Sequence, residues 1–287
     1  ENYLLLWRQK TRSRCSVGWK HNQDRLIENH ISPFLNGLDL HKIDSGHISL
    51  ILEKSLLKGH SAKTTLHLYS FLYKFFYDAV HFFDMDIKNP VKPKYHRPKV
   101  SKKKAKFMTP EQSFVLLEYV MGTRYCNGIW IQILSGLRVS EMLPLTWEDI
   151  DFKNNLIRIS RIYNRATKVI QDYTKNGNQV YVPMSEKLRN HLLKSRGEDD
   201  ELVMPNIYGD MMCYFVYRRY LRNISKKLKL PIRSTHGLRH SCTEIWVDAG
   251  ASAEDLRRLL NHLSLSSTEG YIHRTDDRLN SLAKKIS

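Results

Sequence analysis

The sequence predicts a mainly α-helical protein with one small antiparallel β-sheet (α+β), divided into two domains. Apolar residues at helical spacing dominate both halves, and only three short runs, at 156–163, 167–173 and 179–183, are typical of strands. The 287 residues are enough for two separate hydrophobic cores. We therefore expect a small helical domain, a basic interdomain linker and a larger, mostly helical domain, over 1–87, 88–106 and 107–287.

The net charge of +17, with a pI near 9.7, is unusual for a globular chain. The electrostatic field of so large a positive charge concentrates the chain near polyanions and speeds its encounter with them. Nucleic acid is the leading partner on charge alone, with an anionic membrane surface or mere solubility as alternatives. Because no apolar run reaches the roughly 20 residues that span a bilayer, and residues 1–25 lack a signal-peptide pattern, we expect a cytoplasmic protein without membrane contact.

Four scattered cysteines without a CxxC pair argue against a zinc ribbon or a disulfide scaffold and fit a reducing cytoplasm. They are Cys15, Cys126, Cys213 and Cys242. The chain starts at Glu1 without a methionine, which is typical of a fragment whose N-terminal part is missing.

Residues 88–106, which we call the basic strap, concentrate the positive charge. They contain no acidic residue and nine cations: Lys88, Lys92, Lys94, Arg97, Lys99, Lys102, Lys103, Lys104 and Lys106. Pro90, Pro93 and Pro98 forbid a continuous helix and favour extended backbone. One interpretation is a solvated linker. The clustered charge favours the other, a segment laid along a phosphate backbone, where neutralised phosphates release counterions.

In the first domain, residues 61–81 have the spacing of an amphipathic helix. Its wide apolar face is more typical of a core than of a base-stacking surface; the face consists of Leu66, Tyr69, Phe71, Leu72, Phe75, Phe76 and Val80. Weaker helical patterns cover 19–31 and 43–57.

The second domain opens with a helix start signal. Thr109 is a candidate N-cap, Pro110 suits the first helical position, and Gln112 completes a capping box. We expect helices near 110–121 and 126–143, then the three strands, and mainly helix after Ser185.

Arg138 and Glu141 are three residues apart, so a helix would place them on one face, where Glu141 orients the guanidinium. Taken alone, the pair is more typical of an exposed helical ion pair. Lys175 precedes Asn176-Gly177, the strongest short signal for a β-hairpin turn, so the flanking strands would carry it at a hairpin tip. Most lysines at turn tips are simply solvated.

The string His236-Gly237-Leu238-Arg239-His240 is the most specific one in the chain. With Thr235 as N-cap, His236 and Arg239 lie in the first turn of a helix, where the dipole and free N–H groups favour an anion. His236 and His240 also have the spacing of a metal pair, but Arg239 would place a fixed positive charge beside the cation. His240 is better explained as a structural hydrogen-bonding residue.

A capped helix starts at Ser252 and ends near His262. Tyr271 follows nine residues later, after Gly270 and before a further histidine. A lone tyrosine among 15 is most often a core or surface residue.

Taken in order, these strings resemble the tyrosine recombinases, the phage integrase family. Residues 136–151 are similar to the family's first arginine box, Lys175 to its β-hairpin lysine, 236–240 to its second box, and His262 with Tyr271 to its third. The agreement extends over about 140 residues. Asn261 stands where the family usually has glycine. Residues 1–107 resemble the family's helical core-binding domain only in pattern and position.

The resemblance implies a C-shaped, two-domain DNA clamp and an enzyme that cleaves and rejoins DNA without metal, ATP or another cofactor. It implies Tyr271 as nucleophile, forming a 3′-phosphotyrosyl link, and Lys175 as the acid for the 5′ leaving oxygen. Arg138 and Arg239 would hold the non-bridging oxygens. His236 would accept the tyrosine proton and His262 would bind the phosphate.

The function we expect is therefore a site-specific recombinase or integrase of a phage or mobile element. The resemblance further implies double-stranded DNA recombination sites, a homotetramer that exchanges strands through a Holliday junction, accessory DNA-bending or directionality proteins, and association with the nucleoid. The tail at 276–286 has apolar residues at helical spacing and would dock on a neighbour or on its own domain. A type IB topoisomerase and a non-catalytic DNA-binding protein are the alternatives.

Overall fold

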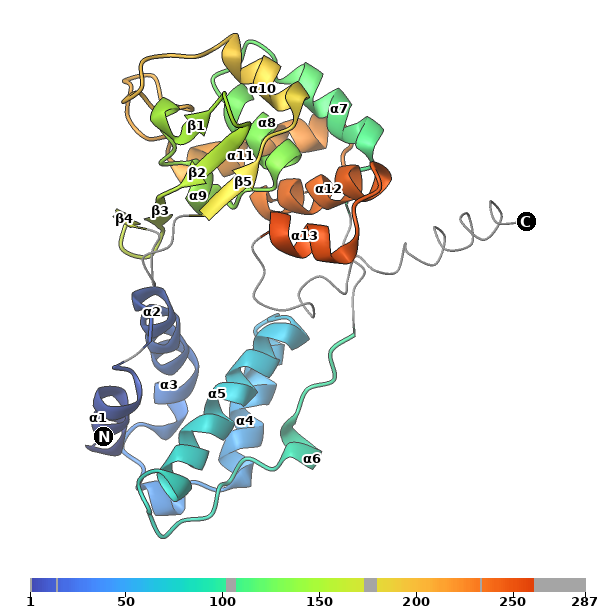
Figure 1. Ribbon diagram of the computed structural model, residues 1–287. Helices are drawn as coiled ribbons and strands as arrows, with labels where there is room; N and C mark the ends of the chain where they lie inside the picture. Colours follow the sequence, from blue (N-terminus) through green and yellow to red (C-terminus); the bar gives the residue numbers. More distant parts are fainter. Residues whose placement is uncertain (1, 14, 102–106, 173–179, 233, 261–287) are drawn as a thin grey trace. The chain divides into compact units, whose positions relative to one another are not determined.

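The computed structural model describes residues 2–13, 15–101, 107–172, 180–232 and 234–260 (Figure 1). The chain divides into two compact units, residues 1–104 and 105–287. Helices dominate both, and the described strands all lie in the second unit. The prediction of a mainly helical chain with little antiparallel sheet is confirmed.

In the described part of the first unit, all regular secondary structure is helical. Its α-helices are α1 (Asn2–Thr11), α2 (Val17–Leu26), α3 (Ser32–Leu35), α4 (Ser45–Leu57), α5 (Ala62–His81) and α6 (Pro93–His96). A π-helical turn (Ile27–Ile31) joins α2 to α3, and a 3₁₀ turn (Leu40–Lys42) precedes α4.

Helix α5 supplies much of the core of this unit. The helix predicted over 61–81 is confirmed. Ser61 is its N-cap and accepts a hydrogen bond from the Thr64 N–H at 3.1 Å. Its apolar face is buried, with Leu72 and Phe76 fully so, and α4 lies alongside it (Figure 1). The aromatic residues of this face therefore form the core, as expected from their spacing.

The helical patterns at 19–31 and 43–57 correspond to α2 with its π-helical turn and to α4. Helix α1 was not expected, because its apolar residues are consecutive rather than periodic and its start lacks a capping signal. It is fixed by tertiary contacts: the Trp7 indole N–H donates to the buried Asp78 carboxylate of α5 at 2.9 Å.

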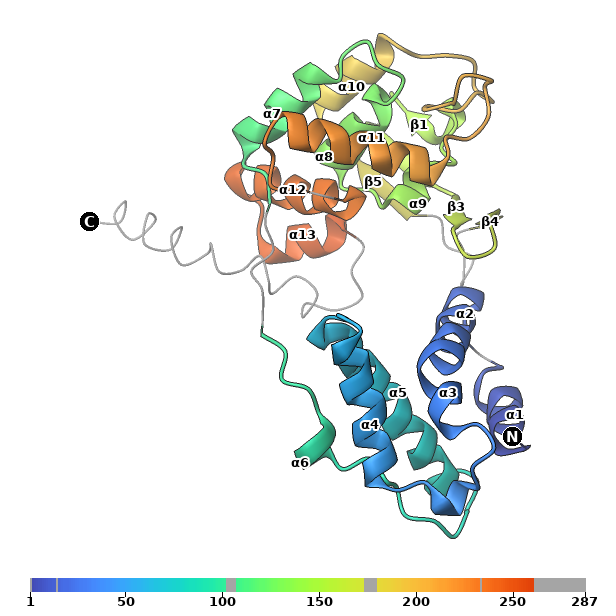
Figure 2. The same ribbon diagram turned by 180° about the vertical axis from the view of Figure 1, so that it is seen from behind.

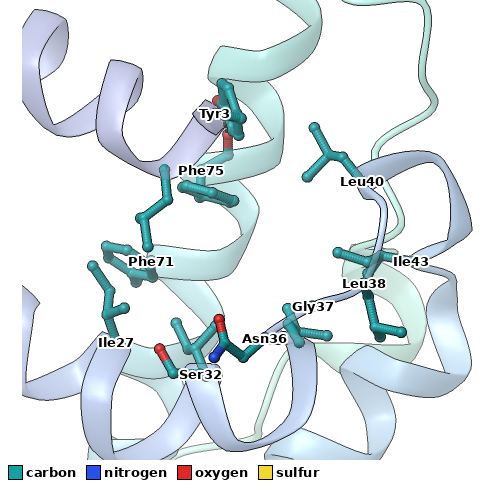
Figure 3. A pocket seen from close by; sticks show the side chains of 13 residues that line it. Tyr3, Ile27, Ser32, Asn36, Gly37, Leu38, Leu40, Ile43, Phe71 and Phe75 are labelled. Carbon is teal, nitrogen blue, oxygen red and sulfur yellow. Dashed lines mark hydrogen bonds between the residues drawn. The ribbon is translucent and has the colours of Figure 1, made fainter. Parts of the chain in front are cut away.

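A pocket of about 100 Å³ lies among α1, α3 and α5 (Figure 3). Its walls are mostly aliphatic and aromatic, including Phe71, Phe75 and Ile43. The Tyr3 hydroxyl at its edge donates to the Phe75 carbonyl at 2.7 Å. With no charged side chain among the described residues of its lining, this pocket is unsuited to bind a phosphate.

The described part of the basic strap, 88–101, packs on the first unit. Val91 is buried in its core, and the His96 ring lies 3.2 Å from the Ser49 hydroxyl. Apart from the single turn α6, this part is non-helical, as its prolines predict. Five of the strap's cations are described, and all are exposed: Lys88, Lys92, Lys94, Arg97 and Lys99.

The second unit contains seven α-helices among its described residues: α7 (Pro110–Tyr119), α8 (Cys126–Ser135), α9 (Val139–Met142), α10 (Glu186–Leu193), α11 (Tyr214–Lys227), α12 (Thr235–Asp248) and α13 (Ala253–Leu259). Its strands are β1 (Ile150–Asp151), β2 (Leu156–Ile159), β3 (Arg161–Asn164), β4 (Val169–Asp172) and β5 (Val180–Pro183), and a 3₁₀ turn (Trp147–Asp149) precedes β1.

Helix α8 lies at the centre of this unit and is almost wholly buried. It packs against α7, α10 and α12, and on its other side Tyr217 of α11 donates to the buried Gln132 at 2.8 Å. Seen from behind, α11 lies in front of α8 (Figure 2). The capping box at Thr109 is present, with the Thr109 N–H donating to Gln112 at 3.1 Å. None of the helices in the described ranges is long and apolar enough to cross a bilayer.

The predicted helix over 126–143 is wrong, because it is broken at Gly136. Gly136 has φ +69°, which ends α8 in the left-handed conformation that suits glycine. Arg138 follows in extended conformation and is the N-cap of the short helix α9. The glycine thus turns the chain so that Arg138 leaves the core.

The strand pairing also differs from the expectation. The run 156–163 is two strands, β2 and β3, separated by Ser160. Strand β5 pairs with β2 and β4 pairs with β3, all antiparallel. Strands β4 and β5, which flank Asn176-Gly177, are therefore not partners, and their expected pairing is wrong; the turn itself lies outside the described residues. The described hairpin turn is 165–168, where the Asn164 side-chain oxygen accepts the Ala166 N–H at 3.0 Å.

Candidate functional site

Three of the six predicted catalytic residues, Arg138, His236 and Arg239, are described. The two arginines lie at the carboxylate of Glu141, and their charges act on His236. The three residues come from the N-cap of α9 and from α12, about one hundred residues apart in sequence. Glu141 is only 3% exposed, so its charge requires compensation. The expected role of Glu141 in orienting Arg138 is consistent with this geometry.

Arg138 makes two contacts with Glu141. Its guanidinium Nη1 donates to Oε1 at 2.7 Å, and its backbone N–H donates to Oε2 at 2.7 Å. Although Arg138 is the N-cap rather than a helical residue, the three-residue spacing still brings the two side chains together. The Arg138 side chain is 39% exposed, so part of its guanidinium edge faces solvent.

Arg239 is held more tightly than Arg138, since its side chain is only 4% exposed. Its Nη1 donates to the Gly136 carbonyl at 2.8 Å and lies 3.8 Å from Oε2 of Glu141. Its Nη2 donates to the Leu260 carbonyl, just after α13, which lies beside α12 (Figure 1). Helix ends therefore fix this guanidinium from two sides.

His236 lies in the first turn of α12, and the N-cap is Ser234, one residue earlier than predicted. The Ser234 hydroxyl accepts the Gly237 N–H at 3.4 Å. His236 is an exposed residue, yet partial desolvation, followed by the charges of Arg239 and Arg138, lowers its pKa. A depressed pKa keeps the imidazole neutral near pH 7, the form that accepts a proton.

His240 lies one turn further along α12. Its ring is 4.2 Å from that of His236, nearly perpendicular to it, and 5.3 Å from that of Phe107. Within the described ranges, no three His, Cys, Asp or Glu side chains gather as metal ligands do.

The remaining predicted site residues lie outside the described residues. They are Lys175, His262 and Tyr271, together with Lys102, Lys103, Lys104 and Lys106 of the basic strap. Their roles stay predictions.

Sequence reasoning missed a second buried carboxylate in this unit. Asp149 is 2% exposed and binds Arg158 and Arg161 at 3.0 Å each. The sequence signal for burial of Asp149 is weak, because nothing local in Trp147-Glu148-Asp149 distinguishes the buried Asp149 from the exposed Glu148. The fold of the following strands, β2 and β3, brings the two arginines to it.

The cluster around Glu141 is suited to bind an oxyanion. Guanidinium groups stay charged and donate fixed pairs of hydrogen bonds to anionic oxygens. The first turn of the 14-residue helix α12 adds its dipole and free N–H groups. The arrangement therefore offers two permanent positive charges and a neutral imidazole at one place.

Residues 106–278 match the sequence pattern of the phage integrase family. Tyrosine recombinase XerA of Saccharolobus solfataricus is 27% identical over 191 residues, which are 66% of this chain and 60% of XerA. The chain thus spans less than two thirds of that relative's length. The Tn1549 transposon integrase in complex with transposon right-end DNA shares the fold, with a TM-score of 0.79 at 20% identity over 98% of both chains. A lambda integrase tetramer bound to a Holliday junction gives a TM-score of 0.71 at 16% identity, over 93% of this chain and 76% of that one.

We predict that Gly136→Ala lowers the free energy of unfolding more than Gly122→Ala. Both glycines have positive φ, so each alanine meets the left-handed backbone cost of about 1–2 kcal/mol. A Cβ on Gly122 meets nothing within 4 Å, whereas one on Gly136 comes to 2.9 Å from Leu260 and 3.2 Å from Cys242. Chemical denaturation measures both, and equal losses would show that Gly136 is not closely packed.

We predict that Arg138→Gln raises the pKa of His236. The positive charge of Arg138 opposes protonation of the ring, so its removal makes the imidazolium easier to form. An NMR titration of the ring protons measures the pKa. Arg196→Gln is the control: Arg196 is half-exposed, its charge is not among those that shift the His236 pKa, and its loss should leave that pKa unchanged. A pKa that stays constant or falls in Arg138→Gln would contradict the geometry.

Proposed function

The chain belongs to the phage integrase family, and from that premise we propose that it is a site-specific DNA recombinase. In this proposal it cleaves and rejoins DNA strands through a 3′-phosphotyrosyl intermediate. The observation that carries it is the pair of guanidinium groups assembled on one buried carboxylate, beside a neutral histidine.

The proposed cleavage step is an in-line exchange of phosphate esters. The Tyr271 phenol oxygen attacks the scissile phosphorus, a P–O bond to the tyrosine forms, and the P–O5′ bond breaks. His236 accepts the phenol proton and Lys175 donates a proton to the departing 5′ oxygen. Because the phosphotyrosyl link retains the energy of the broken ester bond, the released 5′-hydroxyl, or that of another strand, can reverse the step and rejoin the DNA.

Charge neutralisation falls to the two arginines. Arg138 and Arg239 would bind the non-bridging oxygens, on which negative charge grows in the transition state. Arg239 is already fixed by its two carbonyl acceptors, so little reorganisation is needed as that charge develops. His262 would donate a further hydrogen bond to the phosphate, and His240 would support His236.

We further propose that the chain acts on double-stranded recombination sites as a homotetramer, for integration or excision of a mobile element. The transposon integrase with similar fold was bound to transposon-end DNA, and the lambda integrase tetramer to a Holliday junction. These likenesses support the proposal. A type IB topoisomerase would share the chemistry but act as a monomer, and a two-site synapsis assay separates the two.

The basic strap is proposed to lie along the DNA backbone between the proposed domains 1–87 and 107–287. Five of its cations are exposed, and no ion pair with an acidic side chain is found for them in the described part of the chain. Exposed cations held on a packed segment can neutralise phosphates with little loss of backbone entropy.

We predict that Tyr271→Phe abolishes the covalent protein–DNA adduct on a nicked suicide substrate carrying the cognate site. On such a substrate the cleaved fragment diffuses away, so the adduct accumulates and shifts on a denaturing gel. Tyr208→Phe is the matched control, since Tyr208 is 81% exposed on the second unit and should still form the adduct. An adduct in Tyr271→Phe would refute the nucleophile assignment.

We predict that replacing Lys102, Lys103 and Lys104 with Gln weakens binding to cognate and random DNA alike. For every phosphate that the variant no longer neutralises, the slope of log K against log salt should become shallower by about 1. Replacing the same residues with Arg preserves the charge and should preserve the slope. An unchanged slope in the Gln variant would mean that this segment is a passive linker.

A further inference from the structure

The described part of the basic strap is anchored to the first unit at two places. Near its start, the Asn89 side-chain oxygen accepts the Val91 N–H at 2.9 Å, and its Nδ2 donates to the Tyr73 carbonyl of α5 at 3.2 Å. Val91 itself is buried in the core. Further along, the ring of His96, which is only 8% exposed, lies against α4.

Both ring nitrogens of His96 have partners, and these partners fix the tautomer. The Lys92 backbone N–H can only donate, and it lies 2.9 Å from Nδ1, so Nδ1 is the unprotonated nitrogen. The proton of the neutral ring is therefore on Nε2, which lies 3.2 Å from the Ser49 hydroxyl of α4.

The His96 ring is neutral near pH 7, so these donor and acceptor roles apply there. Burial lowers the pKa of His96; the Ser45 carbonyl of α4 acts in the opposite direction, and the charge of Lys92 lowers the pKa further. From α4 the ring thus meets uncharged groups, the Ser45 carbonyl and the Ser49 hydroxyl.

The short helix α6 is built around this ring. Lys92 is its N-cap, Pro93 its first residue and His96 its last. The N–H groups of Tyr95 and His96 donate to the Lys92 carbonyl at 3.0 and 2.9 Å, while the Lys92 N–H donates to the ring. A helix of four residues is far too short to be stable by itself. The His96 ring therefore closes the turn and joins it to α4.

The same turn carries three exposed cations of the strap. Lys92 precedes α6, Lys94 lies within it and Arg97 follows it. Tyr95, between them, is 73% exposed, and Lys94 Nζ lies 5.8 Å from the centre of its ring. Within 92–97, His96 is the only buried residue. The turn thus has one side chain directed to the protein and a set of cations directed to solvent.

We propose that His96 is a positioning residue for DNA binding: its ring docks the α6 turn on α4 and so presents Lys92, Lys94 and Arg97 as a preformed set of cations for DNA phosphates. This inference rests on the proposed function, in which the basic strap lies along the DNA backbone. A segment that is already ordered loses little conformational entropy on binding, whereas a freed one must be ordered by the DNA.

Hydrogen–deuterium exchange measures the anchoring directly. The N–H groups of Lys92, Tyr95 and His96 are all hydrogen-bonded within the turn. In His96→Leu, which fills similar space but has neither ring nitrogen, these amides should exchange faster, while those of α5 stay protected. Because the native ring is neutral near pH 7, the substitution leaves the net charge of the strap unchanged, and a loss of DNA affinity would not come from lost charge.

Affinity for random duplex DNA near pH 7 tests the consequence of this anchoring. We expect His96→Leu to bind about tenfold more weakly, the order of magnitude for one further residue whose backbone is ordered on binding. Ser49→Ala removes the partner of the ring from outside the strap and should weaken binding by about threefold. Ser49→Thr keeps the hydroxyl and should bind like the unaltered chain.

Two further variants separate positioning from stability and from charge. Tyr3→Phe removes a buried hydrogen bond of the same unit, to the Phe75 carbonyl, without touching the strap. It should lower the unfolding temperature and leave DNA affinity unchanged. The double variant Lys92→Gln, Lys94→Gln is the reference for lost cations and should weaken binding with a shallower salt dependence.

Unchanged DNA affinity in His96→Leu, or unchanged exchange of its turn, would overturn the inference and leave the proposed function standing, provided that the lysine reference is weakened. If His96→Leu does not fold, the comparison of Ser49→Ala with Ser49→Thr decides, and equal affinities would overturn the inference.

No weakening in the lysine reference would remove this part of the strap from the DNA, and the inference with it, while adduct formation on the suicide substrate would still support the recombinase. An unaltered chain that neither binds DNA nor forms the adduct would overturn the proposed function itself.

Discussion

The buried carboxylate of Glu141 is the constraint that organises the candidate site. An isolated charge in a protein interior is strongly unfavourable, so the fold must supply compensating donors. Arg138 supplies two hydrogen bonds, and Arg239 lies within 4 Å. Two guanidinium groups that would repel one another in isolation are thereby held together. The net charge of the trio is positive, which leaves a site that favours an anion and disfavours protonation of His236.

The backbone around this trio is arranged to keep it fixed. Gly136 ends the buried helix α8 in a left-handed turn, and the same residue offers its carbonyl to Arg239. One residue therefore both directs Arg138 outward and fixes Arg239 inside. Asp149 is a second buried carboxylate that binds two arginines, Arg158 of β2 and Arg161 of β3. Glu141 joins two distant parts of the chain at fixed positions, which is what transition-state stabilisation by fixed charges requires.

Local signals in the sequence identified much of this arrangement, and the strand pairing was the main miss. The capped start at Thr109, the helix over 61–81 and the contact between Arg138 and Glu141 depend on residues a few positions apart, and all are present. The pairing of β2 with β5 spans β3 and β4 and is encoded by no local pattern, whereas Asp149 is bound by Arg158 and Arg161 on the strands that follow it, an arrangement that appears only once those strands have folded. The strong turn signal at Asn176-Gly177 favoured a pairing of β4 with β5, whereas β4 pairs with β3 around the turn that Asn164 supports.

Adduct formation by Arg138→Ala on DNA with a methylphosphonate at the scissile position decides whether Arg138 acts on the charge of the phosphate. The methyl group removes the negative charge that the arginine is proposed to neutralise, while the bonds made and broken stay the same. We expect Arg138→Ala to be severely slowed on ordinary phosphate, by about 100-fold or more for loss of one charge-stabilising donor, and nearly to match the unaltered chain on methylphosphonate. An equal loss on both substrates would contradict this role, because Arg138 would then serve the structure rather than the phosphate charge.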